Sequence, residues 1–257
     1  MNQLRGPGPL DFGQLVGFDQ ASPHTQGSKA FIETHGTTVL ALKFDGGVLL
    51  LADRRATAGN LIMFDQADKI MPLDDATVVA ISGAFARSIE VCRMLKHSFK
   101  YYKRTVLHEM SLEGKLMEIS RALAGNAPMA MQGIGVFLPI VAAFDPKSGR
   151  FEVYFFDGAG ARFENGSYAC AGSGSERIRG VFEYLSRSKG RFETRSLAEV
   201  LADGLQLLDI AADLDSATGG FGKTLPVTRI LDARGNRPVP EDELRAAADR
   251  VLNRVAG

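Results

Sequence analysis

The sequence predicts an α+β protein in which two antiparallel sheets pack face to face between two layers of helices. Segments with strand patterns and segments with helix patterns alternate in blocks, in the order ββββ, αα, βββ, αα, β, α. Such blocks are typical of antiparallel sheets with separate helix layers, whereas a parallel sheet is built from single βαβ units. The strand segments are apolar at nearly every position, so both faces of each sheet should be covered. These observations favour a four-layer αββα sandwich.

Composition and charge narrow the function classes. The 257 residues are 45% hydrophobic and 23% charged, as in an ordinary globular protein. The formal net charge is zero, so the chain lacks the cationic field that nonspecific phosphate binding requires, and we expect no nucleic acid partner. The same neutrality removes long-range repulsion between copies and permits an oligomer.

The cysteines and the apolar segments indicate a cytoplasmic chain. The two cysteines, Cys92 and Cys170, are too few for the disulfide framework of a secreted domain, and we interpret both as small buried hydrophobic residues. No apolar run approaches the ~20 residues that cross a bilayer, so we expect no membrane contact. The N-terminal residues lack the apolar core of a secretory signal.

Residues 1–36 differ in character from the rest of the chain. Glycine and proline alternate at positions 6–9, a further proline stands at 23, and no apolar period persists, which is typical of a flexible segment. We therefore interpret residues 1–36 as a leader and residues 37–257 as the folded domain. A frayed tail without a role is the alternative.

The first block contains four expected strands. Residues 37–44 and 48–53 form apolar runs on either side of a glycine turn at 45–47, a pattern that predicts a hairpin. Two further strands follow, at 69–73 and 77–82.

The remaining blocks are assigned by the same reasoning. Apolar residues three or four positions apart predict helices over 89–102 and 112–123, and Gly125 and Pro128 should end the second helix. The spacing of Ser196 and Glu199 fits a capping box at the start of a later helix. The other expected elements are strands at 135–144, 151–156, 162–169 and 225–231, and helices at 176–185, 196–208 and after Pro240.

Two glycine-rich segments resemble nucleotide-binding motifs without satisfying them. The segment 217–224 reads ATGGFGKT, but a phosphate-binding loop requires glycine where Ala217 stands and connects a strand to a helix, the reverse of the order expected here. The segment 157–160 reads DGAG and lacks the third glycine and the following helix of a dinucleotide fingerprint. We interpret the second segment as a turn and expect no nucleotide at either place.

The change in character at Thr37 indicates a chemical role. A threonine hydroxyl becomes a nucleophile when a base takes its proton, and the residue's own α-amine, with a pKa of about 7.7–8.0, is a suitable base. That amine exists only if the chain is cut before Thr37. Gly36 has no Cβ, so the backbone can bend to bring the Thr37 hydroxyl against the Gly36 carbonyl carbon. We therefore expect cleavage between Gly36 and Thr37; a polar strand start without chemistry is the alternative.

From Thr37 onward the sequence resembles the β-subunits of bacterial-type 20S proteasomes. The opening TTVLALKFDGGVLLLADRRATAGN is similar to the family's first strands, and Asp53 and Lys69 lie 16 and 32 positions after Thr37, as in the family. Gly83 follows 46 positions after Thr37. The segment GSGS at 172–175 resembles the family's serine loop. The segment DSATGG at 215–220 resembles its Asp-x-x-Ser-Gly-Gly motif.

The resemblance implies a role for each matching residue. Lys69 would place a cation near Thr37 and lower the pKa of its hydroxyl, and Asp53 would pair with Lys69 and orient it. The Gly83 amide would donate to the oxyanion of the reaction. Without the resemblance, these three would be a surface lysine, a turn aspartate and the glycine at a helix start.

Three further residues would form hydrogen bonds around the Thr37 amine: Ser173, Asp215 and Thr218. Ser173 and Asp215 are otherwise a helix cap and a loop residue. Thr218 departs from the family pattern, which has serine at this position. Its hydroxyl keeps the hydrogen bond possible, while the additional methyl group restricts its rotamers.

The resemblance also implies an assembly and an activity. The fold would be that of the N-terminal nucleophile hydrolases, with seven-membered rings of this chain stacked inside rings of α-subunits. An ATPase or another ring-shaped activator would feed unfolded protein to a threonine endopeptidase. Nucleophile, base and oxyanion donor would all come from the chain, so no cofactor or metal is expected.

Five apolar residues occupy the family's positions for the primary specificity pocket: Ala56, Ala67, Met71, Ile81 and Phe85. An apolar pocket predicts cleavage after large hydrophobic residues. Two alternatives to this function remain. The chain could be a threonine hydrolase of the two-ring heat-shock type, which needs no α-subunits, or a non-catalytic structural subunit of a ring.

Overall fold

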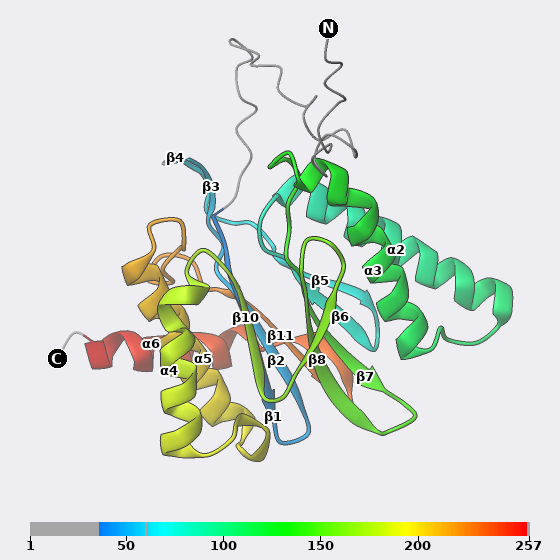
Figure 1. Cartoon of the computed structure of the whole chain (residues 1–257). Coiled ribbons are helices and arrows are strands. Elements are labelled where there is room, and N and C mark those ends of the chain that lie inside the picture. The colour runs from blue at the N-terminus through cyan, green and yellow to red at the C-terminus, as the bar shows by residue number, and fades with distance from the viewer. Residues whose placement is uncertain (1–35, 60, 256–257) are drawn as a thin grey trace, which may run out of the picture. The chain divides into compact units, whose positions relative to one another are not determined.

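The computed structural model describes residues 36–59 and 61–255, which form two antiparallel five-stranded sheets with helices packed outside both (Figure 1). The expected leader lies outside the described residues except for Gly36, so its removal stays a prediction.

The first sheet carries the beginning of the domain. Its strands are β1 (Thr38–Phe44), β2 (Gly47–Ala52), β10 (Tyr168–Gly172), β11 (Val227–Asp232) and β12 (Gly235–Pro238). Their spatial order is β10-β1-β2-β11-β12, and every neighbouring pair is antiparallel. The β1–β2 turn contains Gly46 at φ +92°, a conformation that favours glycine. The hairpin expected at this position is confirmed.

The second sheet is a meander of consecutive strands. It contains β5 (Ile70–Asp74), β6 (Thr77–Ala80), β7 (Ile140–Asp145), β8 (Arg150–Phe156) and β9 (Arg162–Asn165), paired in that order. A separate hairpin of β3 (Ala56–Ala58) and β4 (Leu61–Phe64) belongs to neither sheet. The two sheets pack together through a buried apolar layer to which both contribute.

Alternate residues of β1 enter different layers of the core. Val39 and Ala41 face the second sheet, whereas Leu40 and Leu42 face the helices of the first outer layer, as the two-residue period of a strand requires. This outer layer contains α4 (Ser175–Lys189), α5 (Leu197–Leu214) and α6 (Glu241–Val255).

The helices α2 (Phe85–Val106) and α3 (Leu112–Ala130) cover the outer face of the second sheet (Figure 1). Residues such as Leu95 and Leu116 pack there on Val79 and Val141. The predicted αββα sandwich is therefore confirmed. Its two sheets are apolar on both faces because each lies between a sheet and a helix layer.

Of two helix ends predicted from local sequence, one is confirmed and the other is wrong. Ser196 and Glu199 form the predicted capping box at the start of α5. The prediction that Gly125 and Pro128 end the second helix is wrong, because α3 continues to Ala130. The buried Asn126 side chain accepts from Arg87 Nε at 2.9 Å and donates to the Gly135 carbonyl at 2.6 Å, and these bonds stabilise the last turns.

Several strand boundaries also differ from the prediction. The expected strand at 162–169 divides after Asn165, which pairs with Val153 in the second sheet, while Tyr168 pairs with Leu42 in the first sheet. The expected strand at 135–144 begins only at Ile140. The hairpin of β3 and β4 and the short strand β12 were not predicted.

The structure shows how far the two cysteines are buried and whether any helix could cross a membrane. Cys92 is buried in α2, as expected. Cys170 in β10 is only partly buried where it packs against the core, so the expectation of a buried residue is wrong for Cys170. Both are free thiols. Within the described part of the chain, no helix is long and apolar enough to cross a membrane.

Packing of α4 on the first sheet gives a stability prediction. The fully buried Phe182 ring stacks on Tyr168 with centroids 4.3 Å apart. We expect Phe182→Ala to lower the free energy of unfolding by about 3–5 kcal/mol through lost burial and a cavity. Tyr184 on the same helix is 68% exposed, and Tyr184→Ala should change it by less than about 0.5 kcal/mol. Urea unfolding measures both, and equal losses would contradict this assignment of the core.

Candidate active site

Thr37 lies immediately before β1 and is buried, with 4% of its surface exposed. Its hydroxyl donates a hydrogen bond to the carbonyl oxygen of Gly36 at 2.6 Å. The backbone amide of Ser173, just after β10, donates to the Thr37 carbonyl at 3.0 Å. Gly172 makes this approach possible, since it has φ +100° and a Cβ there would lie 1.9 Å from the Thr37 oxygen. The end of β10 thus holds the residue in place.

Gly36 occupies a space that no larger residue would fit. A Cβ at this position would lie 2.2 Å from Thr57 Oγ1 and 2.8 Å from the Ala217 side chain and carbonyl. The sequence suggested glycine here because its backbone can bend. The structure adds a steric reason. It shows the Thr37 hydroxyl bonded to the Gly36 carbonyl oxygen, and the expected approach to the carbonyl carbon stays a prediction.

Asp53 and Lys69 form a buried ion pair with 2.7 Å between Oδ1 and Nζ and with side chains at most 1% exposed. The Lys69 ammonium also donates to the Arg55 carbonyl and, at 3.3 Å, to the Gly36 carbonyl. Burial lowers the pKa of Lys69, and the charge and hydrogen bond of Asp53 oppose this effect. Lys69 is therefore close to the Gly36–Thr37 peptide bond and has a neutral form that is more accessible than in water.

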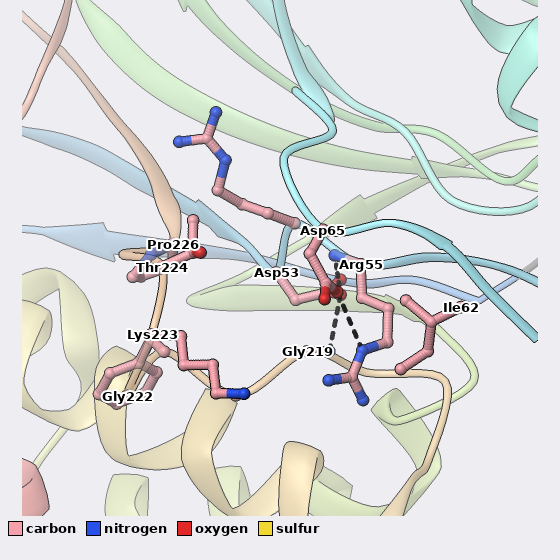
Figure 2. A pocket seen from close by; sticks show the side chains of 12 residues that line it. Asp53, Arg55, Ile62, Asp65, Gly219, Gly222, Lys223, Thr224 and Pro226 are labelled. Atoms are coloured by element: carbon pink, nitrogen blue, oxygen red, sulfur yellow. Dashed lines mark hydrogen bonds and ion pairs between the residues drawn. The ribbon is translucent and has the colours of Figure 1, made fainter.

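Asp53 accepts three further hydrogen bonds, all from backbone amides. Its Oδ1 also accepts from Thr38 at 2.8 Å, and its Oδ2 accepts from Arg55 at 3.0 Å and from Gly219 at 2.9 Å. Figure 2 shows the last two bonds converging on the carboxylate. Asp53 thus connects the start of β1, the residues after β2, and the loop after α5, and it fixes the position of Lys69.

Gly83 precedes α2 in a conformation that requires glycine. It has φ +96°, and a Cβ there would lie 2.4 Å from the Val136 carbonyl oxygen. Gly83 forms a β-bridge with Phe137, and the Ala84 amide donates to Val136 at 2.7 Å. The backbone of Val136 and Phe137 therefore packs against Gly83 and fixes its conformation. Its role as an oxyanion donor stays a prediction.

Ser173, Asp215 and Thr218 are joined by hydrogen bonds, and Ser173 contacts the Thr37 carbonyl. Their hydrogen bonds to the Thr37 amine stay a prediction. Asp215 Oδ2 accepts from the Ser173 hydroxyl at 2.5 Å and from the Thr218 hydroxyl at 2.6 Å. Burial alone would raise the pKa of Asp215, but these hydroxyls and the Ala217 amide lower it below its ordinary value. The methyl group of Thr218 does not prevent its hydroxyl from donating to Asp215.

Two residues of the site were not predicted. The Thr38 hydroxyl lies 2.6 Å from the Thr218 hydroxyl. The Arg55 guanidinium donates to the Ser216 and Thr218 carbonyls at 3.1 and 3.3 Å and to Asp65 at 3.2 Å. Thr38 directly follows Thr37, and Arg55 lies two positions after Asp53. Proximity to an expected site residue does not by itself distinguish either of them from its neighbours.

The comparison with known proteins identifies the family. The proteasome subunit family matches residues 33–222. The chain belongs to this family. It is 34% identical over 248 residues to a proteasome subunit beta from Acidimicrobium ferrooxidans, covering 94% of this chain and 88% of that protein. It is also 34% identical over 229 residues to a proteasome subunit beta from Acidothermus cellulolyticus, covering 85% and 76%.

Membership of the proteasome family agrees with the sandwich fold. It does not decide whether the five predicted residues form the specificity pocket. Ile81 is buried beneath α2 and α3, and Met71 and Phe85 pack against the same layer. Ala56 and Ala67 are also buried. The structure thus groups three of the five residues, and the role of all five stays a prediction.

A cavity of about 350 Å³ lies beside Asp53 (Figure 2). Its walls include Arg55, Ile62 and Asp65 together with residues 219–224, which belong to the glycine-rich segment that resembled a phosphate-binding loop. This segment connects α5 to β11. A phosphate-binding loop connects a strand to a helix, so the predicted reverse order of this segment is confirmed.

The close fit of β10 against Thr37 can be tested by a pair of glycine variants. We expect Gly172→Ala to destabilise the protein by at least about 2 kcal/mol, because the left-handed backbone and the Thr37 carbonyl both exclude a Cβ. Gly180 in α4 has open space around it, so Gly180→Ala should be neutral or stabilising by up to about 1 kcal/mol. Thermal unfolding measures both. Two equally mild variants would show that β10 does not confine Thr37 in this way.

Proposed function

We propose that the chain is a catalytic β-subunit of a 20S proteasome core and that Thr37 is its nucleophile after the Gly36–Thr37 bond is cleaved. One observation carries the proposal: the Thr37 hydroxyl and the Lys69 ammonium both donate to the Gly36 carbonyl, at 2.6 and 3.3 Å. The nucleophile and a cation paired with Asp53 thus meet at one peptide bond. The relatives named proteasome subunit beta support the same function.

The first step in this proposal is self-cleavage. A neutral Lys69 amine takes the proton of the Thr37 hydroxyl, whose oxygen attacks the Gly36 carbonyl carbon. The resulting ammonium stabilises the oxyanion and then returns a proton to the departing Thr37 nitrogen as the C–N bond breaks. Water hydrolyses the ester that joins Gly36 to Thr37 Oγ1. The products are a leader ending in a carboxylate and a chain that begins at Thr37.

The second step uses the amine that cleavage releases. The Thr37 α-amine accepts the hydroxyl proton, and the oxygen attacks the carbonyl carbon of a bound peptide. The scissile C–N bond then breaks, the α-ammonium returns its proton to the departing peptide nitrogen, and an acyl-enzyme remains. Lys69 lowers the pKa of the hydroxyl, Gly83 donates to the oxyanion, and Ser173, Asp215 and Thr218 orient the amine. Water then releases the acyl group. The proposal includes no cofactor, since every group in these steps comes from the chain.

The assembly follows from the same proposal. Copies of the chain form seven-membered rings within rings of α-subunits in the cytoplasm, and an ATPase or another ring activator supplies unfolded protein. Confinement of the sites would keep a peptidase of broad specificity away from folded proteins. The site argues against a purely structural subunit, because Thr37, Asp53 and Lys69 lie together. The extent of the match to proteasome subunits argues against the two-ring heat-shock type.

The role of Thr37 can be tested by substitution. In assembled particles, we expect Thr37→Ala to reduce hydrolysis of a fluorogenic peptide by at least about 10³-fold, because no other residue supplies the nucleophile. Thr37→Ser keeps a hydroxyl and should retain measurable activity. If the alanine variant degrades peptides at an unchanged rate, Thr37 is not the nucleophile, and a structural role for the chain becomes the better account.

The apolar pocket predicts a substrate preference. Peptides with Tyr or Leu before the scissile bond should be cleaved with a kcat/KM about 10-fold or more above peptides with Arg or Glu there, because a charged group would be desolvated without a partner. A matched fluorogenic series measures the preference. Faster cleavage after a basic or acidic residue would show that these five residues do not form the pocket.

A further inference from the structure

The side chain of Thr38, next to the nucleophile, lies in a chain of hydrogen bonds that begins in the interior and ends at the partly buried Asp215. Its hydroxyl accepts from the Gly174 amide at 3.1 Å and lies 2.6 Å from the Thr218 hydroxyl. The Thr218 hydroxyl in turn lies 2.6 Å from Asp215 Oδ2. Thr38 and Thr218 are both 0% exposed, so water cannot replace the two buried bonds of the Thr38 hydroxyl. The bond from Thr218 to Asp215 is partly buried.

The direction of every proton in this chain follows from its two ends. An ionised carboxylate can only accept, and the lowered pKa of Asp215 keeps it ionised. Thr218 therefore uses its single proton to donate to Asp215. Thr38 must then donate to Thr218, and its remaining acceptor capacity is met by the Gly174 amide. The opposite direction would place two lone pairs against each other at Asp215.

The space for these hydroxyls depends on a glycine. A Cβ at Gly174 would lie 2.4 Å from Thr38 Oγ1 and 2.8 Å from Thr218 Oγ1. Both threonines are β-branched, which restricts the rotamers of their hydroxyls. The arrangement thus depends on three positions that come from β1, the start of α4 and the loop after α5.

We propose that Thr38 is a positioning residue of the reaction, which holds Thr218 and Asp215 beside the Thr37 amine. Its backbone amide donates to Asp53 at 2.8 Å, while its side chain leads to Asp215, so one residue connects the Asp53–Lys69 pair to the groups around the amine. The inference rests on the proposed function. It adds a residue to which that function assigns no role.

The test compares Thr38→Val, which keeps the shape of the side chain but removes the hydroxyl, with Thr38→Ser, which keeps the hydroxyl. Assembled particles are used after intact mass has shown how many copies begin at Thr37, so that rates refer to processed sites. We expect the valine variant to lose about 5- to 30-fold in kcat, as for one hydrogen bond in a charged network, with KM changed less. The serine variant should stay within about threefold of the parent.

The pH profile separates positioning from a general loss of structure. The negative charge of Asp215 raises the pKa of a neighbouring amine. If Thr38→Val lets Asp215 move away, the acidic limb of the kcat/KM profile shifts to lower pH. A variant that only destabilises the fold would lower the rate equally at every pH. Arg177 and Lys69 also act electrostatically on Asp215, and neither is altered.

Each outcome bears on the proposal. An unchanged rate and profile in Thr38→Val would overturn it, and so would a rate loss without the shift. If Thr38→Val particles do not assemble, Thr38→Ala removes the same hydroxyl with a smaller side chain and should show the same shift, and its absence there would overturn the proposal. Thr37→Ala is the reference: if it stays active, the proposed function fails, whereas an inactive Thr37→Ala with an unaffected Thr38→Val refutes this inference alone.

Discussion

The buried ion pair between Asp53 and Lys69 is the interaction on which the site depends. Removing one member of such a pair leaves an uncompensated charge in the interior and typically costs about 3–5 kcal/mol. If Lys69 were removed, the Asp53 carboxylate would still accept hydrogen bonds from three backbone amides, which would offset part of this loss. These amides come from segments far apart in the sequence, so the carboxylate fixes both the local backbone and the position of Lys69.

The pair also explains how one lysine can serve two states of the proposed reaction. Burial favours its neutral form, whereas Asp53 favours the charged form. Burial outweighs Asp53, so the pKa of this amine beside the Gly36 carbonyl lies below that of an ordinary lysine. A surface lysine, which has no desolvation, would remain charged and could act only as a cation. The sandwich supplies this burial because the pair lies where β2 and β5 of its two sheets come together.

Sequence patterns predicted the layers of the fold because both faces of the strands are apolar. The division of residues 162–172 between two sheets was not predictable, because the pairing of Asn165 with Val153 and of Tyr168 with Leu42 is a long-range choice. The continuation of α3 past Pro128 depends on Asn126, whose partners Arg87 and Gly135 are also defined by tertiary structure. Local propensity contains neither kind of information.

The site divides in the same way. Thr37 was predicted by its chemistry, and Asp53 and Lys69 were predicted by spacing that resembles the proteasome family. The structure brings the three together at the Gly36 carbonyl. Thr38 and Arg55 were missed because their roles arise from contacts with the loop after α5, over 160 positions away. A threonine in a strand and an arginine after one have no local pattern that distinguishes them.

The central claim is that peptide hydrolysis depends on a free α-amine at Thr37. The intact mass of the chain in purified, peptide-degrading particles tests it most directly. The account predicts the mass of residues 37–257, with Thr37 as the amino terminus. Active particles in which every copy still carried residues 1–36 would contradict it, because an acylated nitrogen cannot accept the hydroxyl proton.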